Sequence, residues 1–102
     1  MSGDTLQRIQ QWYNAHCDGE WEEQFGVKID TLDNPGWTVL IDLSATPLAD
    51  AEFKEIHDVS HPTDWISCRV RDGRFEGAGG PFKLEQLLGT FLDWAAQHER
   101  AR

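Results

Sequence analysis

The sequence has few cysteines and no long hydrophobic run. Its two cysteines, Cys17 and Cys68, are too few to cross-link a small secreted scaffold. The longest clear apolar run is Val39-Leu40-Ile41, far shorter than a membrane span, and the sequence has no secretory signal pattern. We therefore expect a cytoplasmic protein with two unpaired thiols and no membrane partner.

Basic residues are also scarce. The chain has nine Lys and Arg against eighteen Asp and Glu, so its net charge is −9. Phosphate binding needs a basic face, which excludes nucleic acid as a direct partner. Residues 1–51 hold nine acidic and two basic residues, whereas residues 52–102 hold nine acidic and seven basic ones. The acidic first half favours solubility and the steering of a basic protein partner.

The length of 102 residues fits one domain, spanning residues 1–102. A chain of this size buries roughly two thirds of its unfolded surface, which allows one modest core. Five Trp and five Phe are many for this length, so we expect a few large rings to dominate that core.

The stretch Thr63–Pro81 contains the clearest hairpin pattern. Within Asp64–Arg71, apolar side chains alternate with polar or large ones, which predicts a half-buried strand with Ile66, Cys68 and Val70 inward. Asp72-Gly73 is a strong tight-turn signal, and Arg74–Ala78 returns as the partner strand with Phe75 inward. Gly77–Pro81 then ends this strand and leads into a helix.

A second hairpin is predicted upstream. Residues 26–32 and 37–43 both alternate between apolar and polar side chains, with Trp37, Val39, Ile41 and Leu43 on one face of the second strand. The turn at residues 33–36 places Pro at its first central position and Gly at its second. We expect Gly36 there to adopt a positive φ.

Helical patterns occur at both ends of the chain. The first helix runs to about Cys17, with an apolar stripe through Leu6, Ile9, Tyr13 and His16/Cys17 that Trp12 widens. The last helix covers Lys83–Arg100, with a broad apolar face and Trp94 at its edge. Residues 20–25 suit a short helical turn. Residues 51–59 fit either a helix or a strand, and we favour a strand at 53–58.

Together these elements predict the α+β class. We expect a mostly antiparallel sheet of about five strands built from two hairpins, with the N- and C-terminal helices packed on one face.

No residue pattern identifies a reaction, so we expect neither an enzyme nor a cofactor. His57 and His61 share no helix face that would favour a metal site, and Cys68 points inward, which is wrong for a nucleophile. Gly77–Pro81 precedes a helix and could present N–H groups to an anion, but a strand-to-helix connection is the more common use of such a cluster.

Two surface features are better candidates for binding a partner. One is the acidic-aromatic segment Asp18–Phe25 with two further acids in the next strand and turn. The other is an outward row on the strand of the later hairpin, with Arg74 and Glu76 beside it; alternatively its tryptophan packs under a loop and its arginines pair with local acids. The candidate partner-binding residues are Glu20, Trp21, Glu22, Glu23, Asp30, Asp33, Trp65, Arg69 and Arg71.

Longer motifs resemble a known family. The segments IQQWYNAHCDGEWEEQFGVKIDTLDNPGW (residues 9–37), DWISCRV (64–70), FEGAGGP (75–81) and the closing helix at 84–94 resemble the bacterial immunity protein 53 family. The resemblance covers most of the chain and is weakest at residues 49–61.

The resemblance implies a role in polymorphic toxin systems, as a cytoplasmic protein that binds and neutralises a cognate toxin domain. It carries no catalytic residues with it. We expect stoichiometric occlusion of a basic toxin, for example a nuclease. The alternative is a small ligand-binding or enzymatic domain that uses a pocket on the sheet. The sequence does not indicate an oligomeric state.

Overall fold

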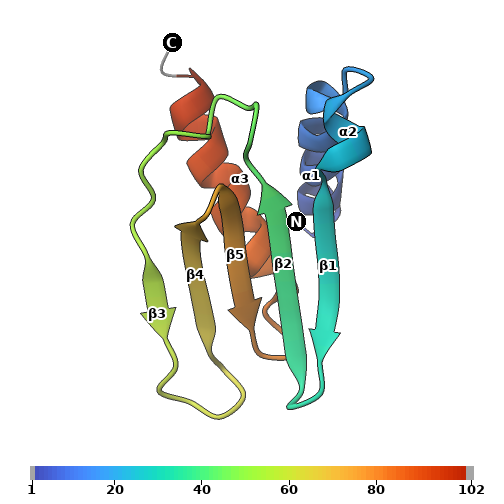
Figure 1. Cartoon of the computed structure of the whole chain (residues 1–102). Helices are drawn as coiled ribbons and strands as arrows, with labels where there is room; N and C mark the ends of the chain where they lie inside the picture. The colour runs from blue at the N-terminus through green and yellow to red at the C-terminus, as the bar shows by residue number, and fades with distance from the viewer. Residues whose placement is uncertain (1, 101–102) are drawn as a thin grey trace.

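The computed structural model describes the backbone of residues 2–100 and the side chains of residues 4–99. The elements in chain order are α1 (Ser2–His16), α2 (Trp21–Gln24), β1 (Val27–Leu32), β2 (Gly36–Asp42), β3 (Ile56–Asp58), β4 (Ile66–Arg71), β5 (Arg74–Gly79) and α3 (Leu84–Arg100). The sheet forms one layer, and α1 and α3 lie together behind it (Figure 1). This confirms the predicted α+β class, and in the part of the chain that the structure describes no helix covers the other face of the sheet.

The five strands form one sheet in the order β1-β2-β5-β4-β3, and every neighbouring pair is antiparallel. Both predicted hairpins are present, β1–β2 and β4–β5, and their pairing places β2 and β5 in the middle. The segment of uncertain type does contain a strand, but β3 covers only three residues, which is shorter than predicted. The sheet therefore has two edges, a short one at β3 and a longer one at β1.

The two hairpin turns differ from each other. Asp72 and Gly73 have φ angles of 56° and 77°, the left-handed pair that a tight hairpin turn needs. At the other turn the Asn34–Pro35 peptide is cis, and Gly36 is already the first residue of β2. The prediction that Gly36 takes a positive φ is wrong. Glycine is required there for space, because a Cβ atom would collide with the carbonyl oxygen of Gly79 on β5.

The core lies between the sheet and α3. The alternation predicted from the sequence is confirmed, because Val39, Ile41 and Leu43 of the β2 segment and Cys68 and Phe75 of the other hairpin are fully buried. The helix contributes a matching buried face, namely Leu87, Leu88, Phe91, Leu92 and Ala95. Each large side chain removed from water in this way contributes about 1.5–3 kcal/mol before entropy is counted.

Helix α1 is turned differently from its predicted stripe. Thr5, Ile9 and Trp12 are buried, whereas Leu6 is 56% exposed and Tyr13 is 40% exposed. The reason is that α1 packs chiefly on α3 rather than on the sheet. The Trp12 ring meets the Phe91 ring edge-on, with 4.9 Å between centroids.

Trp94 is also more central than the sequence suggested. It is buried rather than lying at the edge of the helix face, and its Nε1 donates to the carbonyl oxygen of Glu52 at 2.7 Å. The loop between β2 and β3 therefore closes over α3, and its Phe53 ring packs against Trp94 with centroids 5.2 Å apart.

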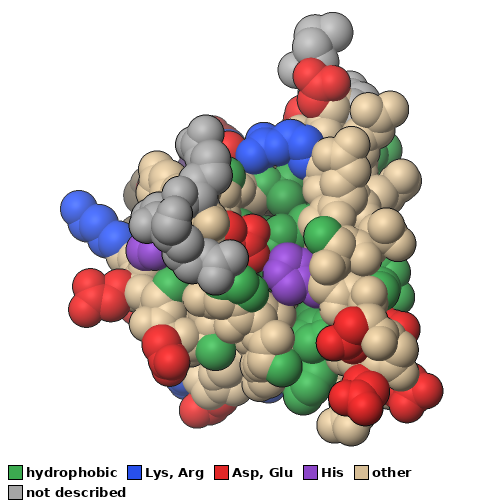
Figure 2. Space-filling model, turned by 90° about the horizontal axis from the view of Figure 1, so that it is seen from above, with side chains coloured by type: hydrophobic (Ala, Val, Ile, Leu, Met, Phe, Trp, Pro, Cys, Tyr) green, Lys and Arg blue, Asp and Glu red, His purple; other side chains and the backbone are tan. Residues whose placement is uncertain are grey.

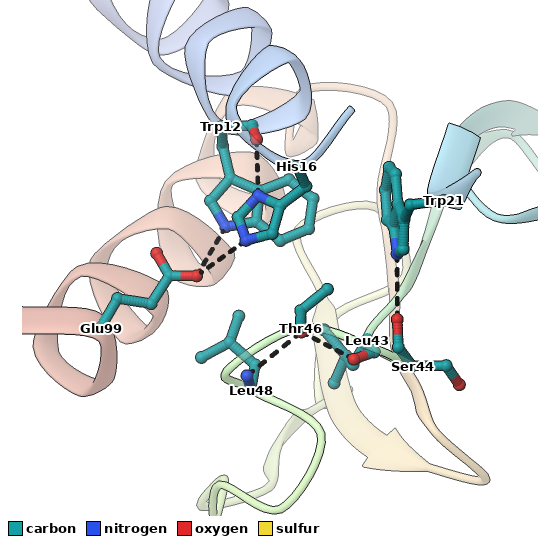
Figure 3. A network of polar contacts seen from close by, with 8 residues as sticks. All are labelled: Trp12, His16, Trp21, Leu43, Ser44, Thr46, Leu48 and Glu99. Atoms are coloured by element: carbon teal, nitrogen blue, oxygen red, sulfur yellow. Dashed lines mark hydrogen bonds and ion pairs between the residues drawn. The ribbon is translucent and has the colours of Figure 1, made fainter. Parts of the chain in front are cut away.

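A set of polar contacts connects α1 with α3 and orders the loop after β2 (Figure 3). Oε2 of Glu99 accepts a hydrogen bond from Nε1 of Trp12 at 3.3 Å and lies 3.2 Å from Nε2 of His16. Nearby, the Thr46 hydroxyl donates to the Leu43 carbonyl and accepts from the amide of Leu48. These contacts join α1 to α3 and fix the start of the loop after β2.

Candidate partner-binding surfaces

The loop that leads into α2 is held by two of its own carboxylates. Oδ1 of Asp18 accepts hydrogen bonds from the amides of Glu20 (3.0 Å) and Trp21 (2.9 Å). These bonds favour the ionised carboxylate and lower the pKa of Asp18. Glu22 in turn accepts from the amides of Asp18 and Gly19, both at 2.9 Å. Asp18 and Glu22 therefore shape the loop, and the side chains of Glu20 and Glu23 are exposed.

Trp21 is part of the core. Its side chain is only 4% exposed, its Nε1 donates to the carbonyl oxygen of Ser44 at 3.0 Å, and its ring packs edge-on against Trp12 (Figure 3). Burial of this large apolar ring is more favourable than its exposure on the acidic loop, and the ring is buried at the end of the sheet. Trp21 therefore anchors the loop in the core, and we leave it out of the proposed surface.

The exposed acids are distributed along the β1 side of the molecule. Glu20 precedes α2 and Glu23 lies within it, near one end of β1, whereas Asp30 lies on the strand and Asp33 lies in the turn at its other end. Viewed from above, acidic side chains gather on the α2 side with no Lys or Arg among them (Figure 2). Within residues 18–36 the only basic residue is Lys28. We call Glu20, Glu23, Asp30 and Asp33 the acidic flank.

The arginine row on the open face of the sheet gathers around Glu76, and Arg71 also lies 3.9 Å from Asp72. Nε of Arg69 lies 2.8 Å from Oε1 of Glu76 on the neighbouring strand, and Arg71 and Arg74 each approach Glu76 to 4.0 Å. The arginines thus pair with a local acid, which was the alternative interpretation of this row. Trp65 is half-buried directly before β4, and its carbonyl oxygen accepts from the amide of Gly80 at 3.0 Å.

A shallow hollow lies on this open face, where a ligand-binding alternative would have its site. Its volume is about 380 Å³, and it forms because Ser67 and Ala78 are small. Thr38 and Leu40 of β2 flank it on one side, and the Arg69–Glu76 pair flanks it on the other. The charged groups at this hollow therefore already have partners in the chain.

The histidine and cysteine side chains considered as metal ligands or nucleophiles have structural roles in the fold. Nδ1 of His61 accepts from the amides of Thr63 and Asp64, which fixes the turn around Pro62. Within the part of the chain whose side chains are described, no three His, Cys, Asp or Glu residues gather as metal ligands would. Burial raises the pKa of the Cys68 thiol to about 11, so a thiolate is disfavoured.

The glycine-rich segment after β5 uses its polar groups within the fold. The amide of Gly80 donates to Trp65, and its carbonyl oxygen accepts from the amide of Lys83. The carbonyl oxygen of Pro81 accepts from Nε1 of Trp37 at 3.0 Å. A Cβ atom on Gly77 would press on Leu87 and Phe75. This segment therefore packs α3 closely against β5, as expected of a strand-to-helix connection.

One surface was not found from the sequence. An apolar groove of about 320 Å³ lies between α1 and the inner face of β1, lined by Ile9, Tyr13, Phe25, Val27 and Ile29. Ile29 lies on the side of β1 that faces the groove, and it is 41% exposed. The sequence contains one signal for this groove, namely that α1 has more apolar positions than one contact face needs. That signal does not show that α1 leaves β1 partly uncovered.

The described chain is thus a small α+β domain with an acidic flank on one side and an arginine row that is paired within the chain. In a comparison with known families, the immunity protein 53 family matches residues 6–96. The chain belongs to the immunity protein 53 family, and membership implies neutralisation of a toxin. No curated protein and no solved structure gives a significant match. Among the described residues, no helix is both long and apolar enough to cross a membrane.

Proposed function

We propose that this protein acts in the cytoplasm by binding one basic toxin domain and covering the surface that the toxin needs for its activity. The toxin we favour is a nuclease, because a groove that binds phosphate is itself basic. The observation that carries the proposal is the acidic flank, in which four exposed carboxylates accompany a single basic residue, Lys28.

The charges of the flank are suited to fast capture. Within the described chain no ion pair involves Glu20, Glu23, Asp30 or Asp33, so their fields are not cancelled by local cations. Complementary charge raises association rates from about 10⁵–10⁶ to as much as 10⁸–10⁹ M⁻¹s⁻¹ at low salt. An inhibitor that must reach a toxin before the toxin reaches its target benefits from this rate directly.

The fold supports occlusion rather than a reaction. Asp18 and Glu22 hold the α2 loop in one shape, and Trp21 anchors it to the carbonyl oxygen of Ser44. A surface that is already ordered loses little conformational entropy when a partner docks on it. The proposal therefore needs no catalytic residue, in agreement with the family.

The first experiment is co-expression with the toxin encoded beside this gene. We expect cell survival and a complex of one chain per toxin domain, measured by co-purification and light scattering. Survival without any complex would contradict stoichiometric occlusion and would favour a ligand-binding or enzymatic role at the hollow beside Arg69.

The second experiment tests the charge of the flank. The double variant Glu20→Lys/Glu23→Lys should slow association at least tenfold at low salt, because the encounter becomes repulsive. Glu22 is left unchanged because it holds the loop.

The matched control is Glu52→Lys/Glu55→Lys. Both control residues are exposed and precede β3 at the opposite edge of the sheet, and the net charge changes equally. Equal slowing by both doubles would show that net charge alone acts and would remove the acidic flank from the proposal.

A further inference from the structure

Strand β1 has an edge that no other strand covers. The sheet ends at β1, which pairs with β2 on one side, and no strand of the described chain pairs with the other side (Figure 1). This edge is six residues long, twice the length of the β3 edge. Proteins usually shorten or cover such edges, because unpaired N–H and C=O groups form a template for another strand.

The register shows which backbone groups face outward. The amide of Asp42 donates to the carbonyl oxygen of Gly26 at 3.1 Å, so these two residues form a hydrogen-bonded pair. Such pairs alternate along an antiparallel ladder, which directs the backbone groups of Val27, Ile29 and Thr31 away from β2 and toward the free edge.

The side chains of these same residues point toward the helices, where the groove lies. The groove between α1 and β1 is lined mainly by Ile9, Tyr13, Phe25 and Ile29, and its volume is about 320 Å³. Tyr13 and Ile29 remain 40% and 41% exposed. A strand added to β1 would place every second side chain beside this groove, because side chains alternate between the two faces of a sheet.

The charges around this edge select the occupant. Glu20 and Glu23 lie at one end of β1, Asp33 lies at the other, and Asp30 projects from the open face between them. An acidic segment is repelled, and a second copy of this chain would bring an identical acidic flank against the first. A segment with Lys or Arg beside alternating apolar residues satisfies both the groove and the rim.

We propose that an extended segment of the toxin adds to the free edge of β1 as a sixth strand, with its apolar side chains in the groove between α1 and β1 and its basic side chains on the acidic flank. Backbone hydrogen bonds to Val27, Ile29 and Thr31 supply affinity, and the groove supplies selectivity, as in other cases of strand addition. This inference rests on the proposed function and specifies how the partner docks.

The main test is Ile29→Arg, which fills the groove and repels a basic segment. We expect the dissociation constant for the co-expressed toxin domain to rise at least tenfold. The control is Val59→Arg, because Val59 is a β-branched residue, 48% exposed, next to the opposite edge strand β3. Urea unfolding of both variants establishes that they fold.

A second variant tests the backbone contribution. Ile29→Pro removes an amide that faces the free edge and leaves the β2 ladder bonds in place. It should weaken the complex, whereas Lys28→Pro removes an amide that pairs with β2 and should destabilise the sheet itself. If Ile29→Arg and Ile29→Pro both fold and bind as tightly as the wild type, strand addition at β1 is wrong, although the wild type still protects cells.

Hydrogen exchange of the purified complex gives a direct measurement. The amides of Ile29 and Thr31 should exchange rapidly in the free protein and become protected in the complex. Protection confined to the open sheet face or to α3 would overturn the inference. Protection of Ile29 in the free protein that grows with its concentration would assign the edge to a second copy and overturn it as well. Failure of the wild type to protect cells or bind the toxin would instead remove the proposed function.

Discussion

Nε of Arg69 lies 2.8 Å from Oε1 of Glu76, so the two side chains form an ion pair between neighbouring strands on the open face of the sheet. Glu76 is also within 4.0 Å of Arg71 and Arg74. Glu76 thus lies within 4.0 Å of three guanidinium groups, although Arg71 also lies 3.9 Å from Asp72.

Replacing Glu76 should uncover the repulsion among the arginines. Glu76→Gln is expected to lower the free energy of unfolding by about 1 kcal/mol at low salt, and the loss should shrink as salt screens the arginines. Urea unfolding at several salt concentrations measures this. Asp93→Asn, which breaks the exposed pair with Arg8, is the control and should cost less. Equal, salt-independent losses in both variants would contradict the central role of Glu76.

The indole of Trp21 should matter for stability through its N–H group. Trp21→Phe keeps a large ring but leaves the carbonyl oxygen of Ser44 without its donor, so we expect a loss of about 1–3 kcal/mol in urea unfolding. Trp65→Phe is the control, since no hydrogen bond from the half-buried indole of Trp65 is present in the described chain. A larger loss for Trp65→Phe would show that the contact to Ser44 contributes little.

The close approach of the backbone at Gly36 predicts that an alanine at this position destabilises the fold. Gly36→Ala places a Cβ atom against the carbonyl oxygen of Gly79, and backbone cannot move aside cheaply, so we expect several kcal/mol of destabilisation or loss of folding. Gly89→Ala is the opposite case. Its added Cβ meets nothing within 4 Å in the middle of α3, and the helix should gain about 0.4–1 kcal/mol. A stable Gly36→Ala variant would disprove the close approach of β2 and β5.

The Cys68 thiol predicts how stability changes in alkaline solution. Its pKa is raised from 9.0 to about 11 by burial. Between these pH values the unfolded chain has lost a proton that the folded protein keeps, so stability falls as the pH rises from 9 to about 11 and this contribution levels off above. Chemical unfolding across this range should show a steeper fall for the wild type than for Cys68→Ala.

The same burial predicts thiol reactivity. At pH 8 a thiol reagent should modify the half-exposed Cys17 in the folded protein and reach Cys68 only after unfolding. Modification of two thiols at the same rate in the native state would show that Cys68 is accessible and would remove the basis of the pH prediction.

Local chemistry made much of the fold predictable. Alternation around Cys68 and Phe75 placed both side chains in the core, and Asp72-Gly73 marked the turn between them, because period-two patterning and positive φ are set by neighbouring residues. The motifs that resemble the immunity protein 53 family also lie in the sequence itself, and the family match confirms them.

The sequence by itself determined the hairpins, the terminal helices and the acidic character, since each depends on residues close together in the chain. Only the tertiary structure decided that Trp21 reaches Ser44 and that Gly36 touches Gly79. It also decided that α1 rests on α3 and leaves Ile29 beside an open groove. These features depend on how elements distant in sequence approach one another, and packing of large rings between layers sets that distance, which no local pattern encodes.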